Sequence, residues 1–120
     1  MSFNRAASIY VQVANFICRK ILLKEWKEGE KIPDARELAM MLEVNPHSAE
    51  MAIEYLTSRN IVSGKEGIAI VETQAGGRAA TLLKENFISS DLPVLAEKMR
   101  LLNMTIDDLR EALKKINSKS

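Results

Sequence analysis

The 120-residue sequence has few of the residues from which disulfides, metal sites and membrane spans are built. Its single cysteine, Cys18, excludes an internal disulfide, and one histidine cannot complete a His/Cys metal site with ligand spacing. There is also no nucleophile–base motif or glycine-rich phosphate loop, so we expect no enzyme, no cofactor and no metal. No run of 18 apolar residues and no signal-peptide core is present, so we expect no membrane span and a cytoplasmic protein.

The sequence also lacks a surplus of positive charge. Lysine and arginine total 17 against 16 acidic residues, and residues 1–75 hold nine basic and ten acidic side chains. Proteins that bind nucleic acid usually carry a basic surface, because neutralising phosphates supplies most of the non-specific affinity. Composition therefore gives no indication of nucleic acid, and it fits one folded domain or a small domain with an appendage.

Two short helical patterns between residues 34 and 58 organise the chain. Asp34 is a good N-cap with Glu37 three residues on, and Asn45 caps a second helix with Pro46 in its first turn. The apolar positions expected to face a core are Leu38, Ala39, Leu42, Ala49, Ala52, Ile53 and Leu56. Only three residues separate the patterns. So short a turn makes the helices cross, as in a helix-turn-helix whose second helix projects its N-terminus outward.

The segments on either side extend this unit. Two β-rich runs, residues 61–63 and 68–72, flank a four-residue connection that contains two glycines, which predicts a hairpin. A hairpin directly after a helix-turn-helix is the wing of a winged helix. Residues 9–24 predict a preceding helix. Its core-facing positions are expected to be Ile9, Val13, Phe16, Ile17 and Ile21.

Two adjacent glycines, Gly76 and Gly77, indicate a break, after which helical patterns resume. Pro93 interrupts these patterns or starts a new helix, and Thr105 caps the last one. The helices are amphipathic but too few to enclose a core, so we expect a second copy of the chain to cover them, against the alternative that they fold back. The expected dimer interface is Phe87, Leu92, Leu95, Met99, Leu102, Ile106, Leu109 and Leu113.

The predicted fold is thus mainly α: a winged helix-turn-helix domain with a small β-hairpin wing (residues 1–75), followed by a C-terminal helical dimerisation segment (residues 76–120). The motif Arg-Glu-Leu-Ala at residues 36–39, followed by Val-Asn-Pro at residues 44–46, resembles the GntR family of bacterial transcription regulators. The C-terminal part resembles the small YtrA-like branch of that family. The resemblance covers nearly the whole chain. It implies a DNA-binding regulator, expected to be a repressor, that acts as a homodimer on a pseudo-palindromic operator.

A helix-turn-helix places the first turns of its second helix in the major groove of double-stranded DNA. The expected DNA-binding residues are therefore Asn45, His47, Ser48 and Glu50, with Lys65 and Gly67 at the wing tip. The resemblance adds Arg36, at a position that contacts the DNA backbone in the family. Each has a simpler interpretation that the sequence leaves open. Arg36 could pair with Glu37 or Glu50, and the other side chains could be ordinary solvent-exposed surface.

The charge of the second helix leaves the function open as well. Members of the family usually carry an arginine where this chain has Met51, after a small polar residue where it has Glu50. The chain could bind DNA weakly and with strong salt dependence, or it could be a winged-helix protein-interaction module that has lost DNA binding. An effector of unknown chemistry could lie among Phe87, Leu95 and Met99, although these apolar residues could equally be plain packing.

Overall fold

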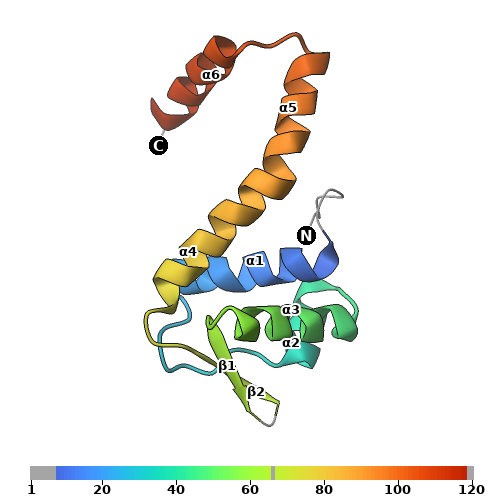
Figure 1. The fold of residues 1–120 in the computed structure, drawn as a ribbon, viewed down its shortest axis with the longest axis vertical. Helices are drawn as coiled ribbons and strands as arrows, with labels where there is room; N and C mark the ends of the chain where they lie inside the picture. Colours follow the sequence, from blue (N-terminus) through green and yellow to red (C-terminus); the bar gives the residue numbers. More distant parts are fainter. Residues whose placement is uncertain (1–7, 66, 119–120) are drawn as a thin grey trace.

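The computed structural model describes residues 8–118 except residue 66. In chain order the elements are α1 (Ile9–Leu22), α2 (Ala35–Leu42), α3 (Pro46–Ser58), β1 (Val62–Lys65), β2 (Ile68–Val71), α4 (Ala75–Asn86), a π-helical turn η1 (Phe87–Asp91), α5 (Leu92–Leu101) and α6 (Ile106–Ser118). The molecule is elongated, measuring 51 × 27 × 23 Å. The first three helices and the hairpin gather at one end, and α5 and α6 lie at the other (Figure 1).

The helix-turn-helix forms where the capping signals predicted it. The Asp34 carboxylate accepts a hydrogen bond from the Glu37 amide at 2.9 Å, and the Glu37 carboxylate accepts one from the Asp34 amide at 3.1 Å. Asn45 accepts from the His47 amide at 2.8 Å, and Pro46 is the first residue of α3. Between the helices Glu43 adopts a left-handed conformation, which turns the chain within three residues.

The hairpin pairs β1 with β2 in antiparallel register, from Val62 opposite Val71 to Lys65 opposite Ile68. The predicted four-residue connection is therefore wrong. Gly64 lies within the ladder opposite Ala69, and the pairing extends to Lys65 opposite Ile68. The segment before α2 joins this sheet through an isolated bridge between Lys31 and Ile70, so the hairpin is tied to the body of the protein.

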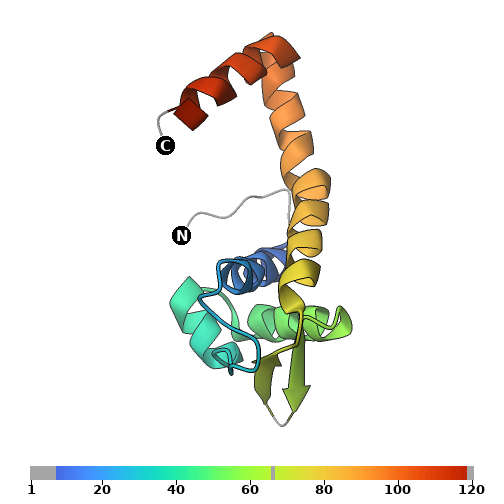
Figure 2. The same ribbon diagram turned by 90° about the vertical axis from the view of Figure 1, so that its left-hand side faces the viewer.

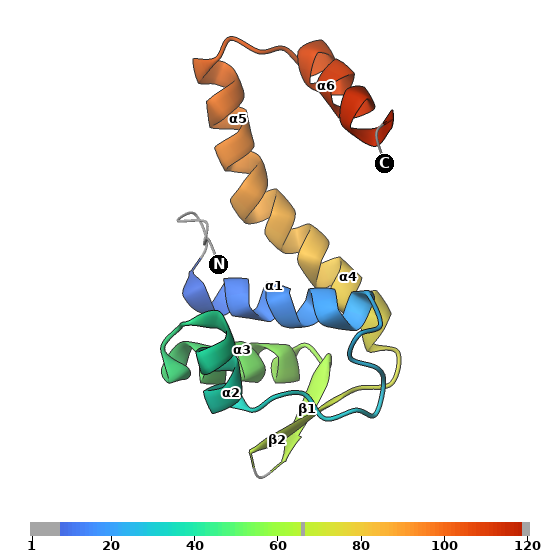
Figure 3. The ribbon, with the colours of Figure 1, turned by 180° about the vertical axis from the view of Figure 1, so that it is seen from behind.

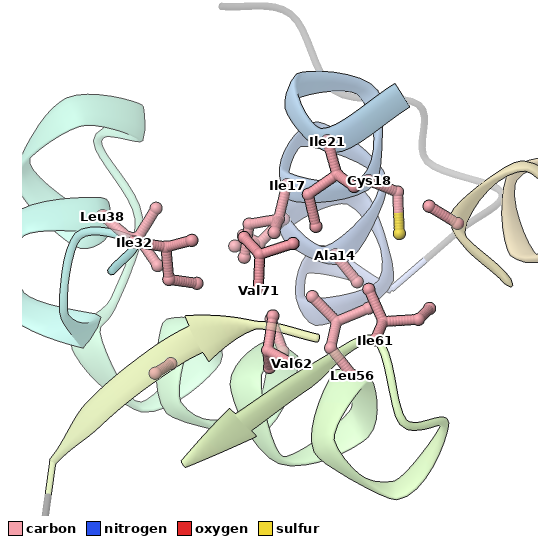
Figure 4. Close-up of a cluster of buried hydrophobic side chains, with 14 of the residues drawn as sticks. Ala14, Ile17, Cys18, Ile21, Ile32, Leu38, Leu56, Ile61, Val62 and Val71 are labelled. Atoms are coloured by element: carbon pink, nitrogen blue, oxygen red, sulfur yellow. The ribbon is translucent and has the colours of Figure 1, made fainter. Parts of the chain in front are cut away.

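One apolar core holds the helix-turn-helix, the hairpin and α1 together (Figure 4). Its largest fully buried side chains are Ile17, Ile32, Leu38, Leu56, Ile61, Leu82, Val13, Val62, Val71 and Cys18. The expectation that Ile9 faces this core is wrong, because Ile9 lies one turn before Val13, the first buried residue of α1, and is 40% exposed.

Helix α4 continues the same core. Its buried residues Ala75, Ala79 and Leu82 belong to the core cluster, and at its end the Asn86 side chain donates to Asn15 of α1 at 2.8 Å. The two glycines do not break the helix as expected. Gln74 adopts the left-handed conformation that turns the chain, and α4 begins one residue later. The division of the chain after residue 75 stays a prediction.

From α4 the chain continues through η1 into α5 as one rod that rises away from the core (Figure 2). Within η1 the Leu92 amide donates to the carbonyl of Phe87, five residues earlier, which is the wide π-type turn. Pro93 lies in the first turn of α5, where a missing N–H is tolerated. The expected interruption is therefore a π turn within an otherwise continuous helix.

Helix α6 starts at the predicted Thr105 cap and turns back at the top of the rod (Figure 3). We call residues 87–118 the arm, and the elements from α1 to α4 the packed unit. In α5 and α6, both described over their whole length, no residue is buried. None of the described helices has the length and apolar character needed to cross a bilayer.

Candidate nucleic-acid interface

An open hollow of about 800 Å³ lies between the start of α2, the outer face of α3 and the hairpin. It is lined by Asp34, Ala35, Arg36, Glu50, Ile53, Glu54, Thr57, Ser58, Gly64, Gly67, Ile68 and Ala69. The elements that border it lie at the end of the molecule opposite α5 and α6 (Figure 1). A ligand that approached α3 and the hairpin together would therefore meet this surface without contacting the tip of the arm.

The charges around the hollow are unequal. Three carboxylates, those of Asp34, Glu50 and Glu54, line it together with the guanidinium of Arg36. Arg36 is exposed, and its side chain makes no hydrogen bond or ion pair with any described residue. Its pairing with Glu37 or Glu50, which the sequence left open, is therefore not found in this part of the chain. The guanidinium remains available to an anionic partner such as a phosphate.

The start of α3 is open to solvent. The His47 side chain is 76% exposed, and its Nδ1 lies 3.8 Å from Oε2 of Glu50, which is 62% exposed. Ser48 is half-buried in the same turn, and the side-chain oxygen of Asn45 is occupied in capping the helix. The helix N-terminus adds the positive end of the peptide dipoles, which favours an anion at this position.

The structure brings several of the predicted DNA-binding residues together. Arg36, Glu50 and Gly67 line the same hollow, and His47 adjoins it through Glu50. Gly67 has φ +80°, a left-handed conformation that favours glycine. Lys65 pairs with Ile68 through its backbone, but its side chain lies outside what the structure describes.

Sequence reasoning did not assign Glu54, Ile53 or Ile68 to this surface. Glu54 lines the hollow one helical turn after Glu50. The spacing of four residues was the signal that could have paired them, because positions i and i+4 lie on one face of a helix. Ile53 and Ile68 supply apolar surface to the hollow, and Ile68 is 43% exposed.

Elsewhere the chemistry is that of a packed interior. Burial raises the pKa of the Cys18 thiol to about 12, and the opposing effect of the Arg59 charge is smaller. Cys18 is therefore a neutral core residue rather than a reactive thiol. Over the described ranges, no group of three or more His, Cys, Asp or Glu side chains is placed to hold a metal ion.

Comparison with known proteins decides the family. The family described as "Bacterial regulatory proteins, gntR family" matches residues 9–71, more than half of the chain, from α1 to the end of the hairpin. The chain belongs to the GntR family. This confirms the family predicted from residues 36–39 and 44–46.

Similarity to individual proteins extends over nearly the whole chain. The uncharacterized HTH-type transcriptional regulator YhcF of Bacillus subtilis (strain 168) is 28% identical over 120 residues, which are 93% of this chain and 92% of YhcF. YtrA from Sulfolobus acidocaldarius, a GntR-family transcription factor, has a TM-score of 0.54 at 23% identity, over 99% of this chain and 97% of YtrA. S. agalactiae BusR, solved in complex with its busAB-promotor DNA, has a TM-score of 0.68 at 20% identity. That match covers 93% of this chain and 53% of BusR.

The YtrA and BusR similarities extend the shared fold beyond the winged helix to the arm. This GntR-family protein is therefore a transcription regulator with a helical C-terminal segment. The predicted fold class, mainly α with a small hairpin wing and helices behind it, is confirmed.

Proposed function

We propose that this GntR-family regulator binds a pseudo-palindromic operator as a homodimer and represses transcription by occupying it. One observation carries the proposal: the open start of α3, the unpaired Arg36 and the hairpin share one surface, at the end of the molecule opposite the arm. A protein that binds duplex DNA through a winged helix needs these three features on one face. Such a dimer would act where the chromosome lies, in the cytoplasm.

In the proposed complex α3 enters the major groove. His47, Ser48 and Glu50 face base edges, and the free amides at the start of α3 face a phosphate. Arg36 contacts the backbone, whereas Lys65 and the amide of Gly67 reach the adjacent minor groove. BusR, which shares this fold and was captured with promotor DNA, supports the placement.

The arm is the proposed dimer interface. Leu102 is 69% exposed, Ile106 70% and Leu113 47%, an apolar stripe that a single chain leaves in water. The arm rises away from the packed unit instead of folding back onto it, which favours a second copy as its cover (Figure 2). A two-fold dimer places two α3 helices on one side of the duplex, with half-sites roughly 34 Å apart, one helical turn.

The test is a fluorescence anisotropy titration against a pool of random duplexes at low and at moderate salt, with sequencing of the retained fraction. We expect enrichment of a palindrome and an affinity that falls as salt rises, by a slope of about 0.9 per neutralised phosphate. A flat salt response with no enriched sequence would contradict the proposal.

Substitution of Arg36 makes this test specific to the interface. Arg36→Ala removes an exposed cation that supports no described contact, so we expect weaker binding, a salt slope smaller by about one unit and unchanged folding. Arg19→Ala is the matched control, because Arg19 is an exposed cation on α1 and does not line the hollow. Equal losses from both variants would point to long-range charge rather than a phosphate contact at Arg36.

A second function has a specific observation in its favour. With three carboxylates and one guanidinium, the lining of the hollow suits a basic protein segment better than a phosphate backbone. A winged-helix protein-interaction module would have this character, and a titration without salt-dependent DNA binding would favour it. An effector at Phe87, Leu95 and Met99 is compatible with either function.

A further inference from the structure

We propose that α3 selects operator half-sites by their exocyclic amino groups, cytosine N4 foremost, through the carboxylates of Glu50 and Glu54. The inference rests on the proposed DNA binding and adds which base the helix selects. It starts from what α3 carries: its 13 residues, from Pro46 to Ser58, include no lysine and no arginine. The bidentate donor that most often contacts guanine in the major groove is therefore missing from this helix.

The two carboxylates are placed to act together. Glu50 and Glu54 are four residues apart, lie on one face of α3 and line the same hollow. Their outward direction follows from the opposite face of the helix, where Ala49, Ala52 and Leu56 are buried. An α3 helix inserted into the major groove would thus present these carboxylates toward base edges.

Both carboxylates also keep their hydrogen-bonding capacity. Among the described residues the Glu50 carboxylate lies near one basic side chain, that of His47, at 3.8 Å, which is too long for a hydrogen bond. The Glu54 carboxylate makes no hydrogen bond or ion pair with any described residue. Approach to DNA would leave these acceptors without water, so they favour a sequence that supplies donors in return.

The chemistry of the major groove then decides the base. Cytosine offers a single amino donor there, whereas guanine offers only the acceptors N7 and O6, which would repel a carboxylate. Adenine has an amino donor, but N7 lies beside it, so it is the second choice. Met51, 36% exposed on the same helix beside the face that carries the two glutamates, adds an apolar contact suited to a thymine methyl group.

The same two carboxylates lower the affinity of α3 for DNA of any sequence. Two carboxylates near phosphates oppose binding, and Arg36 on the rim of the hollow offsets only part of that charge. Repulsion from the backbone weakens binding to any DNA. At a wrong half-site the carboxylate acceptors also stay unpaired, which weakens binding further. We expect weak non-specific binding with a high ratio of specific to non-specific affinity, and a roughly 5- to 150-fold loss for each cytosine exchanged for guanine on the contacted strand.

The experiment uses the full chain and the duplex retained from the random pool, and changes single atoms of that DNA. At each half-site cytosine, N4-methylcytosine replaces the major-groove amino hydrogen by a methyl group. We expect this change to weaken binding at least fivefold. In the control duplex 7-deazaguanine removes N7 from the paired guanine, and we expect an unchanged affinity.

Protein variants complete the test. Glu50→Gln and Glu54→Gln remove the charge but keep the shape, and glutamine pairs well with adenine. We expect both variants to bind random duplexes more tightly and to lower the preference for cytosine over adenine at one half-site position at least fivefold. Glu97→Gln, an equal charge change on α5, should leave base preference unaltered.

The outcomes separate this inference from the proposed function. A retained palindrome that tolerates N4-methylcytosine but loses binding with 7-deazaguanine overturns the inference and leaves the regulator intact. Glutamine variants that bind every duplex more tightly with the same base preference also overturn it, because the carboxylates then only repel. If no duplex is retained at low salt, the DNA-binding function fails and this inference with it.

Discussion

Two capping boxes of the same kind begin helices in very different surroundings. Asp34 and Glu37 start α2, in which Leu38 is completely buried, whereas Thr105 and Asp108 start α6, in which Ile106 is 70% exposed. Hydrogen bonds from the amide and hydroxyl of Thr105 lower the pKa of Asp108. Local chemistry therefore specifies both helices equally well. The two helices differ in burial. The packed unit buries the apolar face of α2 in its own core, whereas the apolar stripe of the arm stays exposed to water in a single chain.

The largest expected effect comes from disrupting the proposed dimer interface of the arm. Leu113→Asp places a charge on the apolar stripe without disturbing the packed unit, since Leu113 is 47% exposed. We expect a monomer with unchanged thermal unfolding of the packed unit and a loss of two-site avidity, about 10²- to 10⁴-fold in operator affinity. Light scattering and anisotropy measure the two effects. Lys114→Asp, one position along on the polar face, is the control, and a monomeric wild type would contradict the premise.

The junction of the two regions offers the next test. Deleting Ser90 from η1 should convert the π turn into regular helix and change the angle at which α5 and α6 leave α4, because π turns bend helices. We expect the dimer to persist and the preferred half-site spacing to change, with avidity on the original operator reduced. Ser90→Ala keeps the chain length and should change neither. Unchanged spacing after the deletion would mean that the rod does not set the geometry of the dimer.

Within the packed unit the corresponding substitution affects stability rather than assembly. Leu56→Ala removes a completely buried side chain of α3 and leaves a cavity, at a cost of about 2–5 kcal/mol in unfolding free energy. Urea denaturation of the full chain measures it. Leu102→Ala is the matched control, because Leu102 is 69% exposed in a single chain. We expect it to weaken the dimer and to change the unfolding free energy of the packed unit far less. Equal losses would remove the distinction between the two regions.

The capping boxes themselves sharpen the comparison at a smaller scale. Asp34→Ala should cost about 1 kcal/mol of global stability, because α2 cannot fray without exposing Leu38. Thr105→Ala removes an equivalent cap, but since no residue of α6 is buried in one chain, hydrogen exchange should show fraying of α6 alone. The expectation fails if both variants lower the global unfolding free energy equally.

The differences between the packed unit and the arm also separate the features that could be predicted from the sequence from those that could not. The helices could be located from two signals that act within one or two turns: the apolar periodicity and the caps at Asp34, Asn45 and Thr105. The π turn at Phe87–Asp91 and the inclusion of Gly76 in α4 were missed. Both adjoin or lie within α4, which packs against α1, and a local pattern does not contain that contact between distant segments.

The residues of the candidate site can be divided in the same way, into those that a sequence motif places and those whose position depends on contacts between distant segments. Arg36, Glu50 and Gly67 could be placed together from a motif, because a helix-turn-helix with a hairpin has a known geometry. Glu54 and Ile68 could not. Whether an exposed glutamate is bare surface or lines a hollow depends on where the hairpin lies beside α3.

The last test concerns Cys18, the chain's one thiol, which reports on the packed unit alone because the arm contains no cysteine. Its pKa is raised from 9.0 to about 12 by burial, so the folded state keeps the thiol proton while the unfolded state loses it above pH 9. Stability is therefore full below pH 9 and falls as pH rises toward 12, by at most about 1.4 kcal/mol per pH unit.

Urea denaturation of the wild type and of Cys18→Ala at pH 8, 9 and 10 isolates this contribution. Lysine and tyrosine titrate in both proteins, so the difference in slope belongs to the thiol. The wild type should lose stability more steeply above pH 9, although its absolute stability is higher because alanine leaves a small cavity. Parallel slopes would mean that the thiol gains water in the folded state, and thus that α1 and α4 separate more readily than their shared core implies.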